Sequence, residues 1–194
     1  KQTQVLYHHV GSDPAEDTLV AAYGLSDRLP LLDTDFPSIG ITPGSDYAVL
    51  KVKHGDNNEI SLFAAERSAL LSGDIPWTRI CKEADMVSDY AVIENEIFLV
   101  TAKDAPRFKL VSTSLINPDL NIAREVIPAG DLVIDSVASA ADALYVNAKQ
   151  DGVGKVMRVI PGSEPQHLKT PRDGAAYLSS VSPLVEGALI YEST

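Results

Sequence analysis

The chain contains very little cysteine, tryptophan and methionine. Its 194 residues include one cysteine, one tryptophan and two methionines, and aromatic residues make up only 6%. A single cysteine excludes a disulfide within the chain. Cys81 ends the strand-like run Trp77–Cys81, so we expect a buried and unreactive thiol.

Positive charge is also scarce. The chain has 16 Lys and Arg against 27 Asp and Glu, which gives a net charge of −11. Phosphate binding needs a basic surface, and anionic lipid repels a chain of this sign, so we expect neither nucleic acid nor a membrane as a partner.

No apolar run approaches the roughly 20 residues that span a bilayer. No signal peptide is visible and the first residue is Lys1, so we expect a fragment or a processed product.

The motifs of common catalytic and metal sites are missing. The sequence has no Gly-x-Ser-x-Gly, no His-Glu-x-x-His and no Cys-x-x-Cys, and none of its four histidines has Ser and Asp in a recognisable motif around it. His8 and His9 are neighbours in an expected strand, so their side chains point to opposite faces and cannot share a metal. Gly152-Val153-Gly154 fits a hairpin turn, and Asp131 and Asp135 fit loop edges. The sequence therefore predicts no catalytic residue, no metal site and no cofactor.

Alternating apolar and polar residues, rich in Val, Ile, Tyr and Thr, recur along the whole chain and predict strands. Helical periodicity is nearly absent, with one short turn expected at Glu66–Leu71. Four strands look equivalent, and their first residues are 50, 47 and 45 positions apart (97 − 47, 144 − 97, 189 − 144); they are 47–50, 97–100, 144–147 and 189–192.

Further strands follow each of the first three equivalent strands, after a polar turn. The expected third strands are 60–64, 108–112 and 155–160, and the expected fourth strands are 77–81, 124–128 and 166–170. Four short antiparallel strands repeated at this interval are typical of β-propeller blades, and a β-sandwich is the alternative. We therefore predict one all-β domain over residues 1–194, with blades at about 36–85, 86–132 and 133–176 and half-blades at 4–25 and 177–194. Because open sheet edges are unfavourable, we expect the half-blades to pair, within one chain or between two.

Two segments carry distinctive motifs beyond the strand pattern. VLYHHVGSDPAEDTLV (residues 5–20) has a strand ending in Tyr-x-His, followed by Gly-Ser and an acidic turn. VTAKDAPRFKLVSTSL (residues 100–115) has Thr, a few polar residues and then Pro-x-aromatic-Lys-Leu. Both segments resemble the propeller of prolyl oligopeptidases. The resemblance runs from about Gln4 to Thr194, and the related oligopeptidase B has a similar opening segment.

The resemblance implies a role in a two-domain serine peptidase. In that family an α/β-hydrolase domain carries the Ser-Asp-His triad, and a seven-bladed propeller restricts access to short peptides. This sequence matches roughly the second half of such a propeller and none of the hydrolase domain. The expected partners are therefore the hydrolase domain of the same parent chain and a short peptide substrate, with the chain itself non-catalytic. The expected compartment is the cytoplasm, with the periplasm as the alternative.

One turn is singled out by the resemblance. In the family, a turn with the pattern Arg-x-Gly-Cys between the second and third strands of a blade approaches the substrate. The matching residues here are Lys53, His54, Gly55 and Asp56, so Asp56 stands in place of the cysteine. We expect this change to remove sensitivity to thiol reagents and to favour basic peptides; a plain hairpin turn is the alternative.

Equivalent turns of the other blades are expected on the same face, toward the hydrolase domain. They contribute Lys103, Asp104 and Arg107, and then Gln150 and Asp151. The first strands of the blades are expected to line a central channel, with segments 39–42, 88–92 and 136–139 as candidates.

Two other functions stay open. An exposed aromatic hot spot would favour a stand-alone binding module for a protein or peptide, and carboxylates about 5–10 Å apart at the channel would favour a glycosidase.

Overall fold

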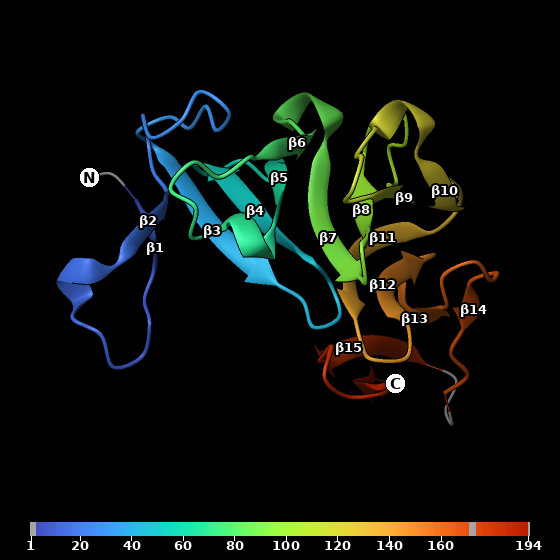
Figure 1. Cartoon of the computed structure of the whole chain (residues 1–194). Helices are drawn as coiled ribbons and strands as arrows, with labels where there is room; N and C mark the ends of the chain where they lie inside the picture. The colour runs from blue at the N-terminus through green and yellow to red at the C-terminus, as the bar shows by residue number, and fades with distance from the viewer. Residues whose placement is uncertain (1–2, 171–173, 194) are drawn as a thin grey trace.

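The computed structural model describes residues 3–170 and 174–193 and consists of antiparallel sheets that follow one another along the chain (Figure 1). Blade I is formed by β3 (Asp35–Ile41), β4 (Tyr47–His54), β5 (Ile60–Glu66) and β6 (Thr78–Cys81). Blade II is formed by β7 (Val87–Ile93), β8 (Glu96–Thr101), β9 (Lys109–Ser114) and β10 (Arg124–Ile127). Blade III is formed by β11 (Val133–Ser139), β12 (Leu144–Gln150), β13 (Val153–Val159) and β14 (Gln166–His167).

A two-stranded sheet lies at each end of this row. The N-terminal half-blade pairs β1 (Val5–Tyr7) with β2 (Thr18–Ala21), and the C-terminal half-blade pairs β15 (Ala175–Val181) with β16 (Ala188–Ser193). The described helices are single 3-10 turns: η1 (Pro14–Glu16), η2 (Arg67–Ala69), η3 (Glu83–Asp85) and η4 (Leu120–Ile122). The prediction of an all-β fold with four-stranded antiparallel blades is confirmed.

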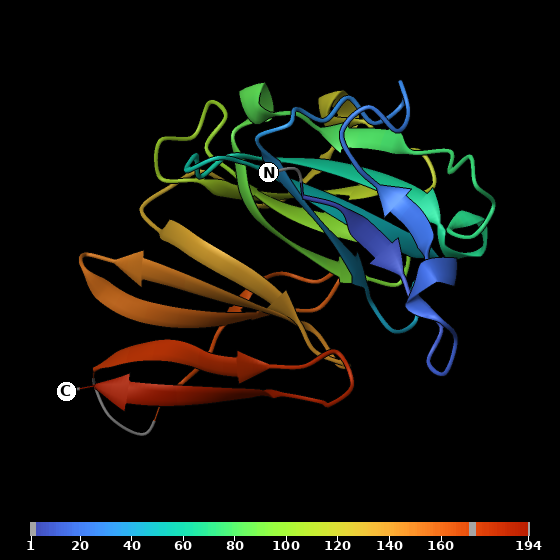
Figure 2. The ribbon, with the colours of Figure 1, turned by 90° about the vertical axis from the view of Figure 1, so that its left-hand side faces the viewer.

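Two details differ from the sequence-based expectation. Strand β1 ends at Tyr7, so His8 and His9 follow the strand instead of belonging to it. The two half-blades also remain separate sheets at opposite ends of the row (Figure 2), so the expected pairing within one chain is wrong. Each half-blade instead packs its apolar side on the neighbouring full blade, which buries that side without closing a ring.

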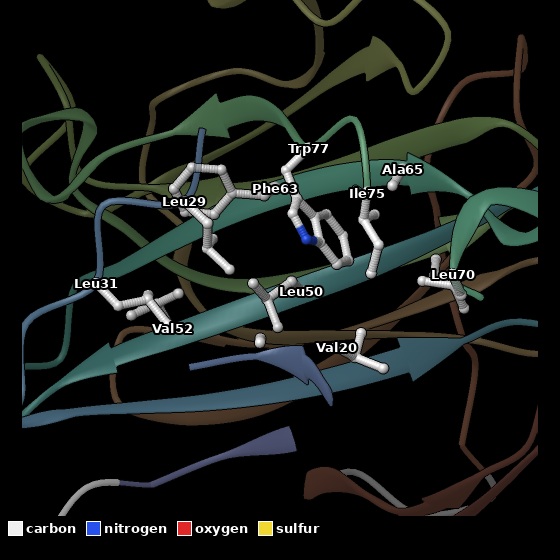
Figure 3. Close-up of a cluster of buried hydrophobic side chains, with 12 residues drawn as sticks. Val20, Leu29, Leu31, Leu50, Val52, Phe63, Ala65, Leu70, Ile75 and Trp77 are labelled. Carbon is white, nitrogen blue, oxygen red and sulfur yellow. The ribbon is translucent and has the colours of Figure 1, made fainter. Parts of the chain in front are cut away.

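The core is divided into layers between successive sheets, because alternate residues of each strand face opposite neighbours. In β4, Leu50 packs toward the N-terminal half-blade and Val49 packs toward blade II. In β8, Leu99 packs toward blade I and Phe98 toward blade III. Figure 3 shows the first layer, in which Trp77 lies among side chains from the N-terminal half-blade and blade I. Burial of a sheet on both sides explains why its strands contain nearly continuous apolar runs.

Polar side chains join adjacent sheets at intervals close to the sequence repeat. Asn95 of blade II accepts a hydrogen bond from the Asp46 backbone N–H (2.9 Å), and Asp89 of blade II accepts one from the Val137 backbone N–H of blade III (2.9 Å). Asp142 of blade III accepts one from the Gly187 backbone N–H of the C-terminal half-blade (2.7 Å). These bonds fix each sheet relative to the next.

Close approach of backbones contributes to the last joint. A Cβ atom at Gly154 of β13 would lie 2.5 Å from the Tyr177 ring and 2.8 Å from the Ala176 carbonyl oxygen. Blade III and the C-terminal half-blade therefore pack at a distance that only glycine permits at this position.

Candidate functional site

The residues singled out in the sequence lie at one end of the blades, which we call the crossover face. It consists of the turns between the second and third strands of each blade, together with the connections that lead from one blade to the next. Lys53 and His54 end β4, and Gly55 and Asp56 form the turn that follows. Gly55 has φ +55°, a left-handed conformation that glycine adopts most easily.

The blade II and blade III turns occupy the equivalent positions. Lys103, Asp104 and Arg107 lie between β8 and β9, and Gln150 and Asp151 lie at the turn from β12 to β13. Asp104 and Asp151 have positive φ values of 55° and 51°, as tight turns require. Which of these residues faces a substrate or another domain stays a prediction.

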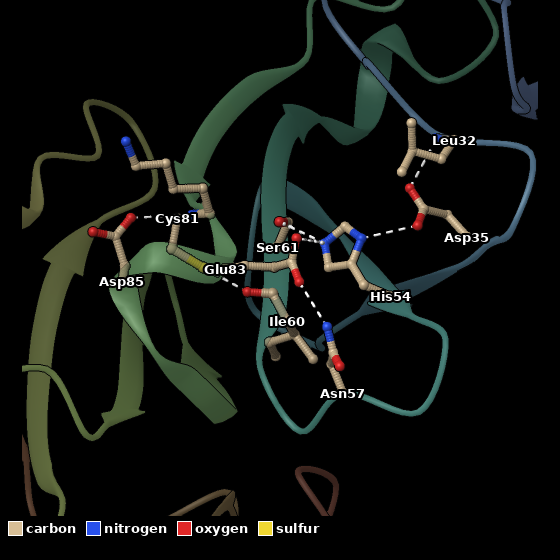
Figure 4. Close-up of polar contacts among 10 residues, drawn as sticks. Leu32, Asp35, His54, Asn57, Ile60, Ser61, Cys81, Glu83 and Asp85 are labelled. Atoms are coloured by element: carbon tan, nitrogen blue, oxygen red, sulfur yellow. Dashed lines mark hydrogen bonds and ion pairs between the residues drawn. The ribbon is translucent and has the colours of Figure 1, made fainter. Parts of the chain in front are cut away.

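Both ring nitrogens of His54 have partners (Figure 4). Nδ1 lies 2.9 Å from Asp35 Oδ1, and Nε2 lies 2.8 Å from Ser61 Oγ. The three residues come from the start of β3, the end of β4 and the start of β5, so they join three neighbouring strands of blade I. The Asp35 side chain is only 2% exposed and its second oxygen accepts a hydrogen bond from the Leu32 backbone N–H (2.9 Å).

The partners fix the protonation pattern of a neutral imidazole. An ionised carboxylate only accepts hydrogen bonds, so Nδ1 carries the hydrogen and donates it to Asp35. Nε2 is then the acceptor, and the Ser61 hydroxyl donates to it. We refer to Asp35, His54 and Ser61 as the blade I relay.

The blade I relay has the connectivity of a hydrolase triad but lacks the setting of one. A nucleophilic serine sits on a strained turn that exposes its hydroxyl beside backbone N–H donors. Ser61 instead lies within the regular strand β5, pairs in register with Val52 and is 8% exposed. The relay therefore serves better as a structural connection than as a reaction centre.

A second carboxylate joins the blade I turn to the next blade. Glu83 lies in η3, on the connection between blades I and II, and accepts a hydrogen bond from Asn57 Nδ2 (2.9 Å). Its other oxygen lies 4.0 Å from His54 Nε2. The turn after β4 is thus held both to the start of its own blade and to the connection that leaves it.

The blade II turn is held in a similar way. Lys103 Nζ donates to Asp85 Oδ1 (2.8 Å), and Arg107 lies 3.6 Å from Asp131 Oδ1. Burial opposes ionisation of Asp85, but hydrogen bonds from Lys103 and from the Lys82 backbone outweigh it and lower the pKa of this carboxyl. Lys53 and Asp56, in contrast, are exposed and form no ion pair within residues 3–170 and 174–193.

Two grooves open beside these turns. One of about 440 Å³ is lined by the blade I relay together with Leu31, Phe63, Arg79, Lys82 and Glu83, among others. Another of about 620 Å³ is lined by Lys82, Asp85, Lys103 and Asp104, among others. Arg107 and Asp56 line neither groove, so the structure does not gather all the singled-out residues into one site.

Sequence reasoning missed the partners of His54. Asp35 is 19 positions before it and Ser61 is 7 after it, and no motif links them. The only signal is that Ser61 interrupts the buried apolar run of β5. Cys81, by contrast, is buried as expected, and burial raises the pKa of its thiol to about 12.

No group of three or more His, Cys, Asp and Glu side chains is placed to hold a metal ion in the part of the chain that the structure describes. Among those same residues, no helix is long and apolar enough to cross a membrane.

Comparison with known protein families identifies the family of this chain. The family described as prolyl oligopeptidase, N-terminal β-propeller domain, matches residues 1–187. The chain belongs to this family. The resemblance seen in the opening segment and in residues 100–115 is thereby confirmed for the prolyl oligopeptidase propeller. Comparison with curated proteins finds no match.

Solved structures share the fold of this prolyl oligopeptidase propeller. A structure from a study of two prolyl endopeptidases is 19% identical, with a TM-score of 0.71, and the match covers 93% of this chain and 25% of that one. Prolyl oligopeptidase B from Galerina marginata, without ligand, is 18% identical with a TM-score of 0.70, covering 94% and 26%. The same enzyme bound to a 35mer hydrolysis and macrocyclization substrate is 18% identical with a TM-score of 0.71, covering 93% and 25%. The chain thus spans about a quarter of the length of these proteins.

Proposed function

We propose that this chain is the non-catalytic propeller part of a prolyl-oligopeptidase-like serine peptidase. The observation that carries the proposal is the family match over residues 1–187, in a chain that spans about a quarter of the length of similar prolyl endopeptidases. The catalytic triad would belong to an α/β-hydrolase domain of the same parent chain. The missing Gly-x-Ser-x-Gly and the buried, mid-strand Ser61 support a role outside the chemistry.

In this proposal the crossover face meets the hydrolase domain. Contacts between domains of one chain are commonly polar, and the turns of this face carry Lys53, Asp56, Lys103 and Arg107. Covering the active site excludes water and strengthens the stabilisation of a developing oxyanion. The same cover admits short peptides and excludes folded proteins, which lets the propeller act as a steric filter without touching the scissile bond.

Asp56 provides a test of which face meets the substrate. In the parent enzyme, we expect Asp56→Lys to lower kcat/KM for a peptide with basic residues about two- to fivefold, because an attractive surface charge becomes repulsive. Glu94→Lys is the matched control, since Glu94 is also an exposed turn acid but lies at the opposite end of the blades, between β7 and β8. Equal effects of the two variants would contradict the assignment of the face.

Activity of the chain alone tests the non-catalytic role. The isolated chain should not hydrolyse a proline-containing chromogenic peptide, whereas the parent enzyme should. Turnover by the purified chain that survives Ser61→Ala would reveal a nucleophile elsewhere, and turnover lost in that variant would make the blade I relay a reaction centre.

A further inference from the structure

His54 stands between two carboxylates that belong to different parts of the crossover face. Asp35, at the start of blade I, is bonded to Nδ1 at 2.9 Å, whereas Glu83, on the connection to blade II, lies 4.0 Å from Nε2. Glu83 is about half exposed and also holds Asn57 of the blade I turn. The Asp35 carboxylate is thus hydrogen-bonded to His54, whereas the Glu83 carboxylate lies close to the ring but beyond hydrogen-bond distance.

The protonation state of the imidazole decides whether the second carboxylate is attracted. Histidine is the side chain that ordinarily exchanges a proton between pH 5 and 8. In the neutral form, Nε2 accepts a hydrogen bond from the Ser61 hydroxyl and has no hydrogen to donate to Glu83. After uptake of a proton from solvent, Nε2 becomes a donor, and the Ser61 hydroxyl rotates to accept from it. The cationic ring then attracts Glu83.

We propose that His54, Asp35, Ser61 and Glu83 form a proton-operated latch that fastens the blade I turn to the connection between blades I and II. Protonation draws Glu83 toward His54 and, through Asn57, tightens the turn. Deprotonation releases Glu83 while the bonds to Asp35 and Ser61 keep the ring in place. The latch is a property of this chain and does not require the proposed hydrolase domain.

The charges around His54 set the strength of the latch. Asp35 from β3 and Glu83 from η3 favour the cationic ring, whereas Arg79 and Lys82, which line the same groove, oppose it. Arg79 is placed over the Phe63 ring, with its guanidinium carbon 5.4 Å from the ring centroid. Because Glu83 is partly exposed, solvent screens the pair, and we expect about a two- to fivefold change in the opening equilibrium of the turn.

Hydrogen exchange of the whole chain at pH 5.5 and 7.5 tests the latch. After correction for the intrinsic pH dependence of exchange, amides of residues 55–58 should be about two- to fivefold more protected at pH 5.5. The blade III turn at Asp151 and Gly152 is the internal control, because no histidine lies in it and its protection should not change with pH.

Two variants distinguish the latch from general effects of pH. His54→Gln retains hydrogen bonding to Asp35 and Ser61 without titrating, and should abolish the pH dependence. Glu83→Gln keeps an acceptor for Asn57 and lies at a half-exposed position, so it should fold and should also abolish the pH dependence. Protection of residues 55–58 that is independent of pH in the unmodified chain, or unchanged pH dependence in Glu83→Gln, would overturn the proposal.

Discussion

Phe98 illustrates how single side chains hold neighbouring blades together. It lies in β8, is fully buried, and packs with residues of blade III such as Leu144 and Val146. Phe36, in contrast, lies in β3 with 53% of its surface exposed. The same residue type thus occurs in a core layer and on the surface, which allows a matched comparison.

Removing the buried ring should weaken the fold much more than removing the exposed one. We expect Phe98→Ala to lower the free energy of unfolding by about 3–5 kcal/mol, through lost burial and the cavity left behind. Phe36→Ala should cost less than about 1 kcal/mol. Urea denaturation followed by circular dichroism measures both, and similar losses would contradict the layer assignment.

Individual site residues were only partly predictable from the sequence. The family pattern identifies the turn that contains His54, but it does not identify Asp35, Ser61 and Glu83 as neighbours of that histidine. Their meeting depends on strand register: Asp35 pairs directly with His54, and Ser61 lies one position from the partner of Lys53. Alternation of apolar residues predicts that a strand exists but does not fix which residue it pairs with.

At the scale of elements, the joint between blade III and the C-terminal half-blade depends on Asp142. Its carboxylate accepts hydrogen bonds from Arg158 Nε (3.0 Å) and Nη2 (2.8 Å), from the Tyr145 hydroxyl (3.1 Å) and from the Gly187 backbone N–H (2.7 Å). Burial raises the pKa of Asp142, but the bonds from Gly187, Arg158 and Tyr145 outweigh it and hold the pKa below its ordinary value.

Loss of this carboxylate should destabilise the joint in a pH-dependent way. Asp142→Ala should lower the free energy of unfolding by about 1–3 kcal/mol at pH 7, because several donors lose their acceptor. A lowered pKa means that the stabilisation is fully present above the ordinary aspartate value, near pH 4, and fades as pH falls further. The difference in the free energy of unfolding between Asp142→Ala and the unmodified chain should therefore become smaller below pH 4. Denaturation curves at pH 3 and 7 measure this difference in the free energy of unfolding. A difference that is larger at pH 3 than at pH 7 would refute this account.

The strands themselves were well predicted because the repeat and the alternation agree. The equivalent strands expected at 47–50, 97–100 and 144–147 lie within β4, β8 and β12. The fourth strands were harder, since the segment expected at 166–170 forms a strand only at Gln166–His167. Outer strands pair along one edge only, so tertiary packing decides their length more than local sequence does.

At the scale of the whole molecule, each half-blade leaves unpaired the edge at which a full blade would continue with its remaining strands. By position in the repeat, β16 is a second strand and β1 is a third strand, yet within residues 3–170 and 174–193 β16 pairs only with β15 and β1 only with β2. Within one chain the sheets are apart, so pairing between two copies is the part of the sequence prediction that stays untested.

Open edges of this kind should promote self-association of the isolated chain. We expect light scattering to show a mass that rises with concentration. Leu189→Lys, at a 69% exposed position in β16, should suppress the rise because charge on an edge strand opposes pairing. Leu184→Lys is the control, since Leu184 is 76% exposed but lies in the turn between β15 and β16. A monomer at every concentration would exclude pairing between copies.

The contact at Gly154 has a consequence for the curvature of the whole row of sheets. Any larger residue there would clash with the Tyr177 ring and with the Ala176 carbonyl oxygen, so the C-terminal half-blade would have to move away from blade III. The diameter of a ring built from such sheets depends on the angle between each pair. A single hydrogen atom in place of a methyl group at residue 154 thus helps to determine how many blades a closed circle can hold.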